Sequence, residues 1–463
     1  MSYLYVSATH KSSGKTTISI GLTRELRRRG HCVQPFKKGP DYIDPLWLSE
    51  SAGRSCLNLD YHTTPPGAIK SSFARQLRGA DFGFIEGNVG LFDSVDLLGS
   101  NSNAELAKLL GAPVLLVVDV QGMARGIAPL LLGYQSFDPA LRIAGVILNK
   151  VGGGGHASNL RRVVEHYTDL PIIGVLPRLP EIGIEERHLG LIPSNESGAV
   201  DATIERIRAV VAEHVDVERI ESIACAAPMP DQSQLDDPPR PPDSGVLTGL
   251  PAVRIGIARD QAFGFYYPDD LAALEAAGAE LVPFSPVRDP ALPDVDALFI
   301  GGGFPECWMH ELEQNASMRA AVADFIASGG PVYAECGGLM YLADRLHWGD
   351  RSCRMCGVLG RDVAMRDRPQ GRGYVRLRET DAFPWPFRRS ASGDILAHEF
   401  HHSAIVEPDP RWVFAYQVLR GVGVDGRHDG IVHKNLLASY AHLRDVGGVD
   451  WTTRFVDRVR ALA

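Results

Sequence analysis

The sequence lacks three features that would each define a class of protein. It has no basic tract and no interleaving of basic with aromatic residues, and its net charge is −9, so we expect no nucleic-acid partner. No apolar run is long enough to span a bilayer, so we expect no membrane partner. The strand-like stretch YLYVSA begins at Tyr3, and we therefore expect no signal peptide.

Cysteine is also scarce. The seven cysteines are odd in number and scattered over 463 residues, which predicts no disulfide framework and a location in the reducing cytoplasm. Cys353 and Cys356 form a single C-x-x-C pair. Because no second pair of this kind occurs, we expect neither a metal nor a redox role for them.

One stretch interrupts the globular composition. Residues 226–251 are rich in Pro, Asp and Ser, which predicts a linker between a domain of residues 1–225 and a domain of residues 252–463. Both parts alternate short apolar runs with helical patterns, and such alternation gives a mostly parallel sheet covered on both faces. We therefore predict an α/β protein with two doubly wound domains. In the second domain, helices are expected near 269–277, 308–327 and 449–462.

The stretch SATHKSSGKTT, residues 7–17, lies between a predicted strand and a predicted helix, the setting of a phosphate-binding loop. Thr9 stands where the pattern G-x-x-x-x-G-K-[ST] has its first glycine, but small serines still let backbone amides approach a phosphate. We expect Lys15 to neutralise phosphate oxygens and Thr16 to ligate Mg²⁺. Asn149, at another strand end, is a candidate for contacting a purine. The predicted nucleotide-binding residues are Ser12, Ser13, Gly14, Lys15, Thr16, Thr17 and Asn149.

Acidic residues follow two other predicted strands. KKGPDYIDP supplies Asp41, Tyr42 and Asp44, and FIEGNVGLFDS supplies Glu86 and Asp93. Functional sites of open α/β sheets lie at the carboxyl ends of strands, and a carboxylate there is where a further Mg²⁺ ligand is expected. Glu86 fits that role. The first domain is thus predicted to use ATP and Mg²⁺.

The second domain contains a candidate nucleophile. PVYAECGGLMYL, residues 331–342, predicts a strand, a sharp turn at Cys336 and a helix, which is a nucleophile elbow with cysteine in place of serine. The helix N-terminus favours a thiolate, and we expect Gly337, with Gly302 and Gly303 of FIGGGFPE, to receive an oxyanion. A cysteine nucleophile needs a histidine base. Spacing alone leaves four candidates, His398, His401, His402 and His442.

Taken together, these motifs resemble the cobyrinic acid a,c-diamide synthase family of glutamine-dependent amidotransferases. The resemblance covers nearly the whole chain apart from the linker. It rests on GKTT, VQPFKKGPDYIDP, EGNVGLFD, ERHLGLIP, GGGFPE, AECGGLMYL, HEFHHS and ASYAHL, in that order. It implies a dethiobiotin-synthetase-like P-loop domain followed by a class I glutamine amidotransferase domain. It also selects His442, within ASYAHL, as the base for Cys336.

The resemblance implies two coupled reactions. Glutamine would be hydrolysed at Cys336 to release ammonia, while ATP would phosphorylate a peripheral acetate carboxylate (a or c) of a tetrapyrrole, and ammonia would displace the phosphate. Asp41, Tyr42, Glu86 and Asp93 would surround the activated carboxylate and metal. Lys37 and Lys38 either attract the anionic macrocycle or are ordinary solvated lysines. A third member of the Cys–His triad is not evident in the sequence, and a homodimer is compatible with size and charge.

Departures from the family pattern leave the macrocycle open. The loop reads ATHKSSGKT where the family usually has G-T-x-S-G-x-G-K-T, and EGNVG replaces E-G-V-M-G. Loops of this kind are associated with sirohydrochlorin- or sirohaem-amidating branches, so a corrin and sirohaem both remain candidates. A different hypothesis is an ATP-switched, partitioning-type binding protein with an inactive amidase domain. The intact Cys336 and His442 argue against it, and the fused cysteine domain argues against a biotin-pathway ligase.

Overall fold

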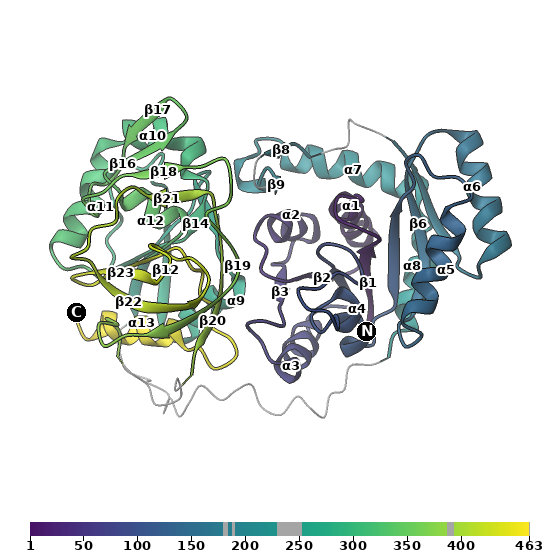
Figure 1. The fold of residues 1–463 in the computed structure, drawn as a ribbon, viewed down its shortest axis with the longest axis horizontal. Coiled ribbons are helices and arrows are strands. Elements are labelled where there is room, and N and C mark those ends of the chain that lie inside the picture. Colours follow the sequence, from purple (N-terminus) through teal and green to yellow (C-terminus); the bar gives the residue numbers. More distant parts are fainter. Residues whose placement is uncertain (179–183, 188–189, 229–251, 387–392, 463) are drawn as a thin grey trace. The chain divides into compact units, whose positions relative to one another are not determined.

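The chain divides into two compact units, Met1–Asp243 and Ser244–Ala463 (Figure 1). The computed structural model describes residues 1–178, 184–187, 190–228, 252–386 and 393–462. Most of the predicted linker, residues 229–251, therefore lies outside the described residues. Among the described residues, no helix has both the length and the apolar character needed to cross a bilayer.

The described residues of the first unit form a seven-stranded sheet in the order β3-β2-β4-β1-β5-β6-β7, and every neighbouring pair is parallel. All but β3 coincide with apolar runs of the sequence, and β3 is too short to show a periodic pattern. The strands are β1 (Ser2–Ala8), β2 (Val33–Lys38), β3 (Leu57–Leu59), β4 (Phe82–Glu86), β5 (Val114–Asp119), β6 (Ile143–Val151) and β7 (Ile172–Pro177), with a separate ribbon of β8 (Glu186–Arg187) and β9 (Gly190–Leu191).

Helices cover both faces of this sheet, as predicted. On β1, Leu4 and Val6 enter one hydrophobic core and Tyr3 and Tyr5 the other, because successive side chains of a strand point to opposite faces. Figure 1 shows α5 (Ile127–Phe137) and α6 (Gly154–Tyr167) side by side over the core that contains Tyr3 and Tyr5. The first core is covered by α1 (Lys15–Arg28), α2 (Ile43–Ala52), α7 (Val200–His214) and α8 (Val217–Cys225), and the second by α3 (Pro66–Leu77), α4 (Asn103–Leu110), α5 (Ile127–Phe137) and α6 (Gly154–Tyr167).

The second unit has a nine-stranded sheet in the order β12-β10-β13-β15-β24-β23-β22-β19-β20 among its described residues. The first five strands pair in parallel, as predicted, and the rest add an antiparallel half that the sequence pattern showed only as short strand-like pieces. The strands are β10 (Val253–Ala258), β12 (Ala279–Phe284), β13 (Ala297–Ile300), β15 (Val332–Glu335), β19 (Gly371–Glu379), β20 (Ile395–His401), β22 (Val413–Arg420), β23 (His428–His433) and β24 (Leu436–Ser439).

Smaller sheets and five helices complete this unit as far as it is described. The small sheets are β11 (Phe263–Phe265) with β14 (Gly302–Gly303), and β16 (Arg345–Trp348), β17 (Arg351–Arg354), β18 (Val363–Met365) and β21 (Ser403–Ile405). One face carries α9 (Pro268–Ala276) and α13 (Trp451–Arg460), and the other α10 (Met309–Gln314), α11 (Ala316–Ala327) and α12 (Gly337–Leu342).

The single helix predicted near 308–327 is wrong, because the chain leaves helical geometry at Asn315, whose ψ is 65°. The Asn315 side chain accepts a hydrogen bond from the N–H of Met318 and donates one to the carbonyl of Pro286 at 2.8 Å. Asparagine competes with the helix through such local bonds, so it ends α10 and caps α11.

Candidate functional site

The phosphate-binding loop joins β1 to α1 and is held in shape by the end of β6. The Asn149 side-chain amide donates to the carbonyl of Ser13 at 2.8 Å, and Lys150 Nζ donates to the carbonyl of Ser12 at 3.0 Å. Gly14 has φ 90°, and a Cβ there would lie 2.2 Å from Asn149 Nδ2, so the loop needs glycine at this point. Asn149 therefore stabilises the conformation of the loop. Its contact with a purine stays a prediction.

The two serines that stand in for glycines differ in position. Ser12 is exposed with φ 62°, whereas Ser13 is buried and its hydroxyl donates to the carbonyl of His10 at 2.8 Å. Ser13 thus contributes to the shape of the loop rather than offering its hydroxyl to a ligand. Thr17 follows in the first turn of α1 and is partly exposed.

Lys15 is buried at the start of α1. It is 8% exposed, and within the described residues it makes no hydrogen bond or ion pair. Burial and the charge of Lys37 lower the pKa of Lys15 to about 8, although Glu86, Asp44 and Asp93 act in the opposite direction. A buried ammonium without a direct partner is costly, so this position favours an anionic ligand such as a phosphate.

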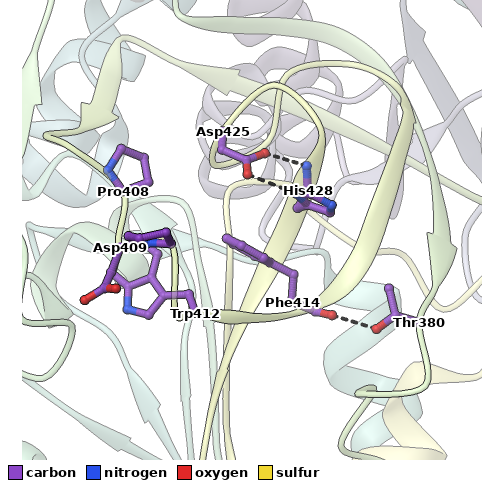
Figure 2. Close-up of a pocket in the computed structure, with 8 residues that line it drawn as sticks. Thr380, Pro408, Asp409, Trp412, Phe414, Asp425 and His428 are labelled. Atoms are coloured by element: carbon purple, nitrogen blue, oxygen red, sulfur yellow. Dashed lines mark hydrogen bonds and ion pairs between the residues drawn. The ribbon is translucent and has the colours of Figure 1, made fainter.

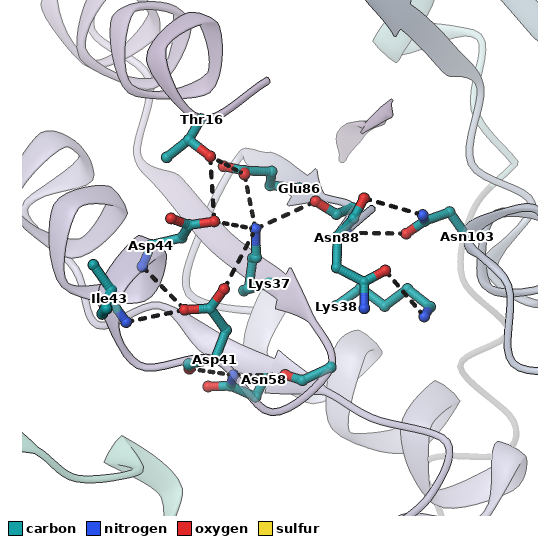
Figure 3. A network of polar contacts seen from close by, with 12 residues as sticks. Thr16, Lys37, Lys38, Asp41, Ile43, Asp44, Asn58, Glu86, Asn88 and Asn103 are labelled. Carbon is teal, nitrogen blue, oxygen red and sulfur yellow. Dashed lines mark hydrogen bonds and ion pairs between the residues drawn. The ribbon is translucent and has the colours of Figure 1, made fainter. Parts of the chain in front are cut away.

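Carboxylates from two motifs meet around one lysine. Figure 3 shows the Lys37 ammonium between Asp44, Glu86 and Asp41, with the hydroxyl of Thr16 above it. Lys37 Nζ lies 2.8 Å from Glu86 Oε1, and Thr16 Oγ1 donates to the same oxygen at 2.8 Å and to Asp44 Oδ2 at 3.2 Å. The structure therefore brings together Thr16, Asp41 and Glu86, which the sequence assigned to one site from separate motifs.

Of the two alternatives for Lys37 and Lys38, that of ordinary solvated lysines is wrong. Lys37 is 2% exposed and Lys38 5%, because both side chains turn inward at the end of β2. Burial lowers the pKa of Lys38 to about 8, partly offset by Asp60. Lys37 is instead an internal counter-ion, and ion pairs with three carboxylates compensate its desolvation.

The donor atoms around Thr16 fit a magnesium ion. Glu86 is fully buried, and its Oε2 has no hydrogen-bond partner among the described residues. A buried carboxylate oxygen without a partner is costly and is able to bind a cation. The Thr16 hydroxyl and the Asp44 carboxylate lie beside it, and Mg²⁺ prefers such oxygen ligands.

The remaining predicted residues lie on the loops that frame this cluster. Asp41 Oδ1 accepts from the N–H groups of Ile43 at 3.0 Å and Asp44 at 3.2 Å, which fixes the start of α2. Tyr42 occupies the N-cap position of α2 and is 9% exposed. Asp93 is exposed, and its Oδ2 accepts from the N–H of Gly90 at 2.8 Å.

Asn103 is a residue of this region that the sequence did not single out. It is fully buried, accepts from the Tyr5 hydroxyl at 2.8 Å and donates to the carbonyl of Gly90 at 2.7 Å. Asn103 also exchanges hydrogen bonds with the backbone of Asn88 (Figure 3), and together these bonds hold the loop that follows Glu86. An asparagine at the start of a helix is so common that its sequence position carries no signal of this role.

In the second unit, Cys336 occupies the sharp turn between β15 and α12. Its φ of 48° and ψ of −98° are strained for a non-glycine residue, as expected of a nucleophile elbow. The glycines around it allow close approach: a Cβ on Gly337 would lie 2.9 Å from the amide nitrogen of Gly303, and one on Gly302 would lie 2.8 Å from His442 Cε1. The predicted oxyanion glycines thus gather beside Cys336.

Cys336, His442 and Glu335 are candidates for a Cys–His–Glu triad. His442 Nδ1 lies 3.2 Å from Glu335 Oε2. Burial opposes a charged imidazole, but Cys336 and Glu335 outweigh it and raise the pKa of His442 to about 10. The backbone N–H of Leu443 donates to Glu335 Oε1 at 3.0 Å and fixes the carboxylate. Glu335 is a candidate acid that sequence reasoning missed, although it directly precedes Cys336.

The other candidate histidines have different partners. The ring of His398 stacks on His442 with centroids 4.9 Å apart. His401 stacks on Tyr440 at 3.9 Å, and His402 Nδ1 contacts the carbonyl of Arg366 at 3.1 Å. Cys336 contributes to the raised pKa of His442, which favours His442 as its partner.

A surface hollow of about 570 Å³ lies elsewhere on the second unit (Figure 2). None of Cys336, His442 and Glu335 lines it, so it is not the site of the triad. Its lining residues are Thr380, Pro408, Asp409, Pro410, Trp412, Phe414, Asp425 and His428.

Comparison with known proteins agrees with this geometry. Residues 5–191 match the CobQ/CobB/MinD/ParA nucleotide binding domain, and residues 254–445 match the CobB/CobQ-like glutamine amidotransferase domain. The chain is therefore a glutamine amidotransferase joined to a nucleotide-binding domain.

Relatives of similar length narrow this class. The chain is 47% identical to the cobyrinate a,c-diamide synthase of Magnetococcus marinus, covering 97% of this chain and 95% of that protein. It is 41% identical to the proteins of that name from Methanosarcina acetivorans (95% and 92% covered) and Archaeoglobus fulgidus (98% and 96%). The chain belongs to the cobyrinate a,c-diamide synthase family, which confirms the resemblance seen in the sequence.

Replacing Glu335 tests the triad. Glu335→Gln removes the charge that orients His442, and we expect glutamine hydrolysis to fall by about 10²- to 10⁴-fold. The Glu335→Gln substitution should also lower the pKa of His442, which can be measured by NMR titration of the imidazole. In the parent, the raised pKa stabilises the fold fully below pH 6.5, and this contribution disappears as the pH rises through about 10.

A matched control shows whether the loss of glutamine hydrolysis is specific to Glu335 or follows from neutralising any ion-paired carboxylate. Glu379 pairs with Arg454 at 3.0 Å, and Arg454 lies on α13. Glu379→Gln should leave glutamine hydrolysis within about threefold of the parent. Equal losses in the two variants would show that Glu335 has no specific part in the triad.

Proposed function

We propose that this chain amidates the a and c carboxylates of cobyrinate, using ATP and glutamine. The observation that carries the proposal is the presence in one chain of a Cys336–His442–Glu335 cluster and of a buried Lys15, without a direct partner among the described residues, beside a carboxylate cluster. Full-length relatives named cobyrinate a,c-diamide synthase support the choice of substrate.

The triad supports glutamine hydrolysis through a thioester. The Cys336 thiolate attacks the side-chain amide carbon of glutamine, and the N–H groups near Gly303 and Gly337 receive the resulting oxyanion. His442 gives its proton to the departing nitrogen, which leaves as ammonia. Water then attacks the thioester, releasing glutamate and restoring the thiol.

The first unit supports activation of the acceptor carboxylate. A carboxylate is a poor electrophile, so transfer of the ATP γ-phosphoryl group to it provides a leaving group, and ammonia replaces phosphate at the acyl carbon. Lys15 and the loop amides would hold the phosphates. Thr16, Glu86 and Asp44 would hold Mg²⁺, which neutralises phosphate charge when bound. We place Asp41, Tyr42 and Asp93 around the reacting carboxylate.

The proposal also includes the cellular location of the protein and its partners. No disulfide joins the cysteines among the described residues, which supports a reducing, cytoplasmic environment. Glutamine and a carboxylated tetrapyrrole are the proposed small-molecule partners, and a homodimer remains compatible with the size of the chain.

The substrate is tested by mass spectrometry of products. The protein is incubated with ATP, Mg²⁺, glutamine and, in turn, cobyrinic acid, hydrogenobyrinic acid, sirohydrochlorin, nickel sirohydrochlorin and sirohaem. We expect cobyrinic acid to gain amides at both the a and the c position. Amidation confined to sirohydrochlorin or sirohaem would overturn the substrate assignment but retain the reaction class. ATP turnover that needs no carboxylated tetrapyrrole would instead favour a nucleotide-switched binding protein.

A further inference from the structure

The C-x-x-C pair has neighbours that its sequence did not reveal. Cys353 lies on β17, and His310 and Glu313 lie on α10. His310 Nδ1 is 3.2 Å from Cys353 Sγ, and the ligand atoms of all three residues lie within 4.8 Å of one another. An imidazole, a carboxylate and a thiol thus converge at one point that the proposed reaction does not use.

The fold explains why these three side chains meet. His310 and Glu313 are three residues apart on α10, so they occupy the same face of the helix. On β17, Cys353 is 1% exposed while its neighbours Ser352 and Arg354 are exposed, so alternation directs the thiol inward. The cluster is therefore set by two regular elements and not by a flexible loop.

We propose that His310, Glu313 and Cys353 bind a divalent transition-metal ion, with Zn²⁺ as the best chemical match and a water molecule as fourth ligand. Zinc accepts nitrogen, sulfur and oxygen donors in tetrahedral geometry, whereas Mg²⁺ and Ca²⁺ prefer oxygen donors alone. Zn–S and Zn–N bonds of about 2.3 and 2.0–2.1 Å at a tetrahedral angle separate sulfur from nitrogen by about 3.6 Å. The observed 3.2 Å needs only a small adjustment of the side chains.

The surroundings of the cluster suit a metal ligand set. Glu313 Oε1 accepts from the backbone N–H of Arg354 at 2.7 Å, which orients the carboxylate as second-shell bonds do in metal sites. His310 is exposed, so an ion can enter from solvent. On binding, the Cys353 thiol releases its proton to solvent as the sulfur–metal bond forms. The bound ion would tie α10 to β17.

The second cysteine of the pair lies outside this site. Burial raises the pKa of Cys356 to about 12, although the neighbouring Tyr341 acts in the opposite direction. Its sulfur is absent from the group of converging ligand atoms. Cys356→Ser is therefore a matched control for Cys353→Ser, since it removes a neighbouring, partly buried thiol without removing a ligand.

Zinc content tests the site directly. The full chain is stripped with a chelator, incubated with Zn²⁺, desalted and measured by inductively coupled plasma mass spectrometry. We expect about one zinc per chain in the parent, in Cys336→Ser and in Cys356→Ser, and loss of this zinc in Cys353→Ser and His310→Ala. Thermal unfolding with and without Zn²⁺ should show a rise in melting temperature in the same three proteins alone.

A spectroscopic measurement on the parent does not depend on how well the variants fold. Co²⁺ in this site should give a thiolate-to-metal charge-transfer absorption, because one of the ligands is sulfur, and Cys356→Ser should retain it. Failure of the folded parent to retain zinc, or equal zinc in the parent and in folded Cys353→Ser, would overturn the proposal. Either result would leave the proposed amidation unaffected, because Cys336 and Lys15 belong to other sites.

Discussion

Cys336→Ser is expected to abolish glutamine-supported amidation and to leave ammonia-supported amidation intact. The substitution removes the thiolate that forms the thioester, so glutamine hydrolysis should fall by about 10³-fold or more. The carboxylate cluster and Lys15 lie in the other unit, so activation of the acceptor carboxylate should persist. Product formation is measured with glutamine and with an ammonium salt as alternative nitrogen donors.

The control for this variant is another cysteine of the same unit. Cys307 is partly exposed and lies outside the triad, so Cys307→Ser should retain both activities. If Cys336→Ser released glutamate as fast as the parent, Cys336 would not be the nucleophile. If it lost ammonia-supported amidation as well, with the fold intact, the assignment of separate reactions to the two units would be wrong.

Lys15→Met is expected to impair amidation with either nitrogen donor and to spare glutamine hydrolysis, the reverse of the effect of Cys336→Ser. Amidation should fall by about 10²- to 10³-fold with either nitrogen donor, because the phosphates lose a charge-assisted partner, whereas basal glutamine hydrolysis should continue. The same substitution removes a buried ammonium that has no direct partner among the described residues. The melting temperature of the ligand-free protein should therefore stay the same or rise.

Lys11 supplies the matched control because it is an exposed lysine of the same loop. Lys11→Met should change neither amidation nor stability appreciably. A marked fall in the stability of ligand-free Lys15→Met would show that Lys15 has a structural partner. Unchanged ATP-dependent activity in Lys15→Met would show that the loop does not bind the reacting nucleotide.

Local patterns predicted the parts of the fold that depend on neighbouring residues. The strand at Tyr3, the loop around Gly14 and the turn at Cys336 each follow from a short run of sequence, because a buried parallel strand is continuously apolar and is followed by its functional loop. The order of such runs was enough to predict two α/β units and the two groups of site residues.

Features that depend on distant partners could not be predicted in this way. Glu335 is a candidate triad acid only because the fold brings it to His442, which lies 107 positions later. Lys37 is buried because carboxylates from two other segments compensate its charge. His310 and Cys353 are 43 positions apart, and only the packing of a helix on a strand makes them neighbours. Each depends on a tertiary contact that leaves no periodic signal.

The most direct test of the proposed reaction traces the nitrogen of the glutamine side-chain amide into the product. The parent protein is given cobyrinate, ATP, Mg²⁺ and glutamine labelled with ¹⁵N at its side-chain amide, and the corrinoid product is analysed by mass spectrometry. We expect a product that carries ¹⁵N at both new amides, with glutamate and ADP formed alongside. A cobyrinate that remains unamidated, or one whose amides carry no ¹⁵N, would contradict it.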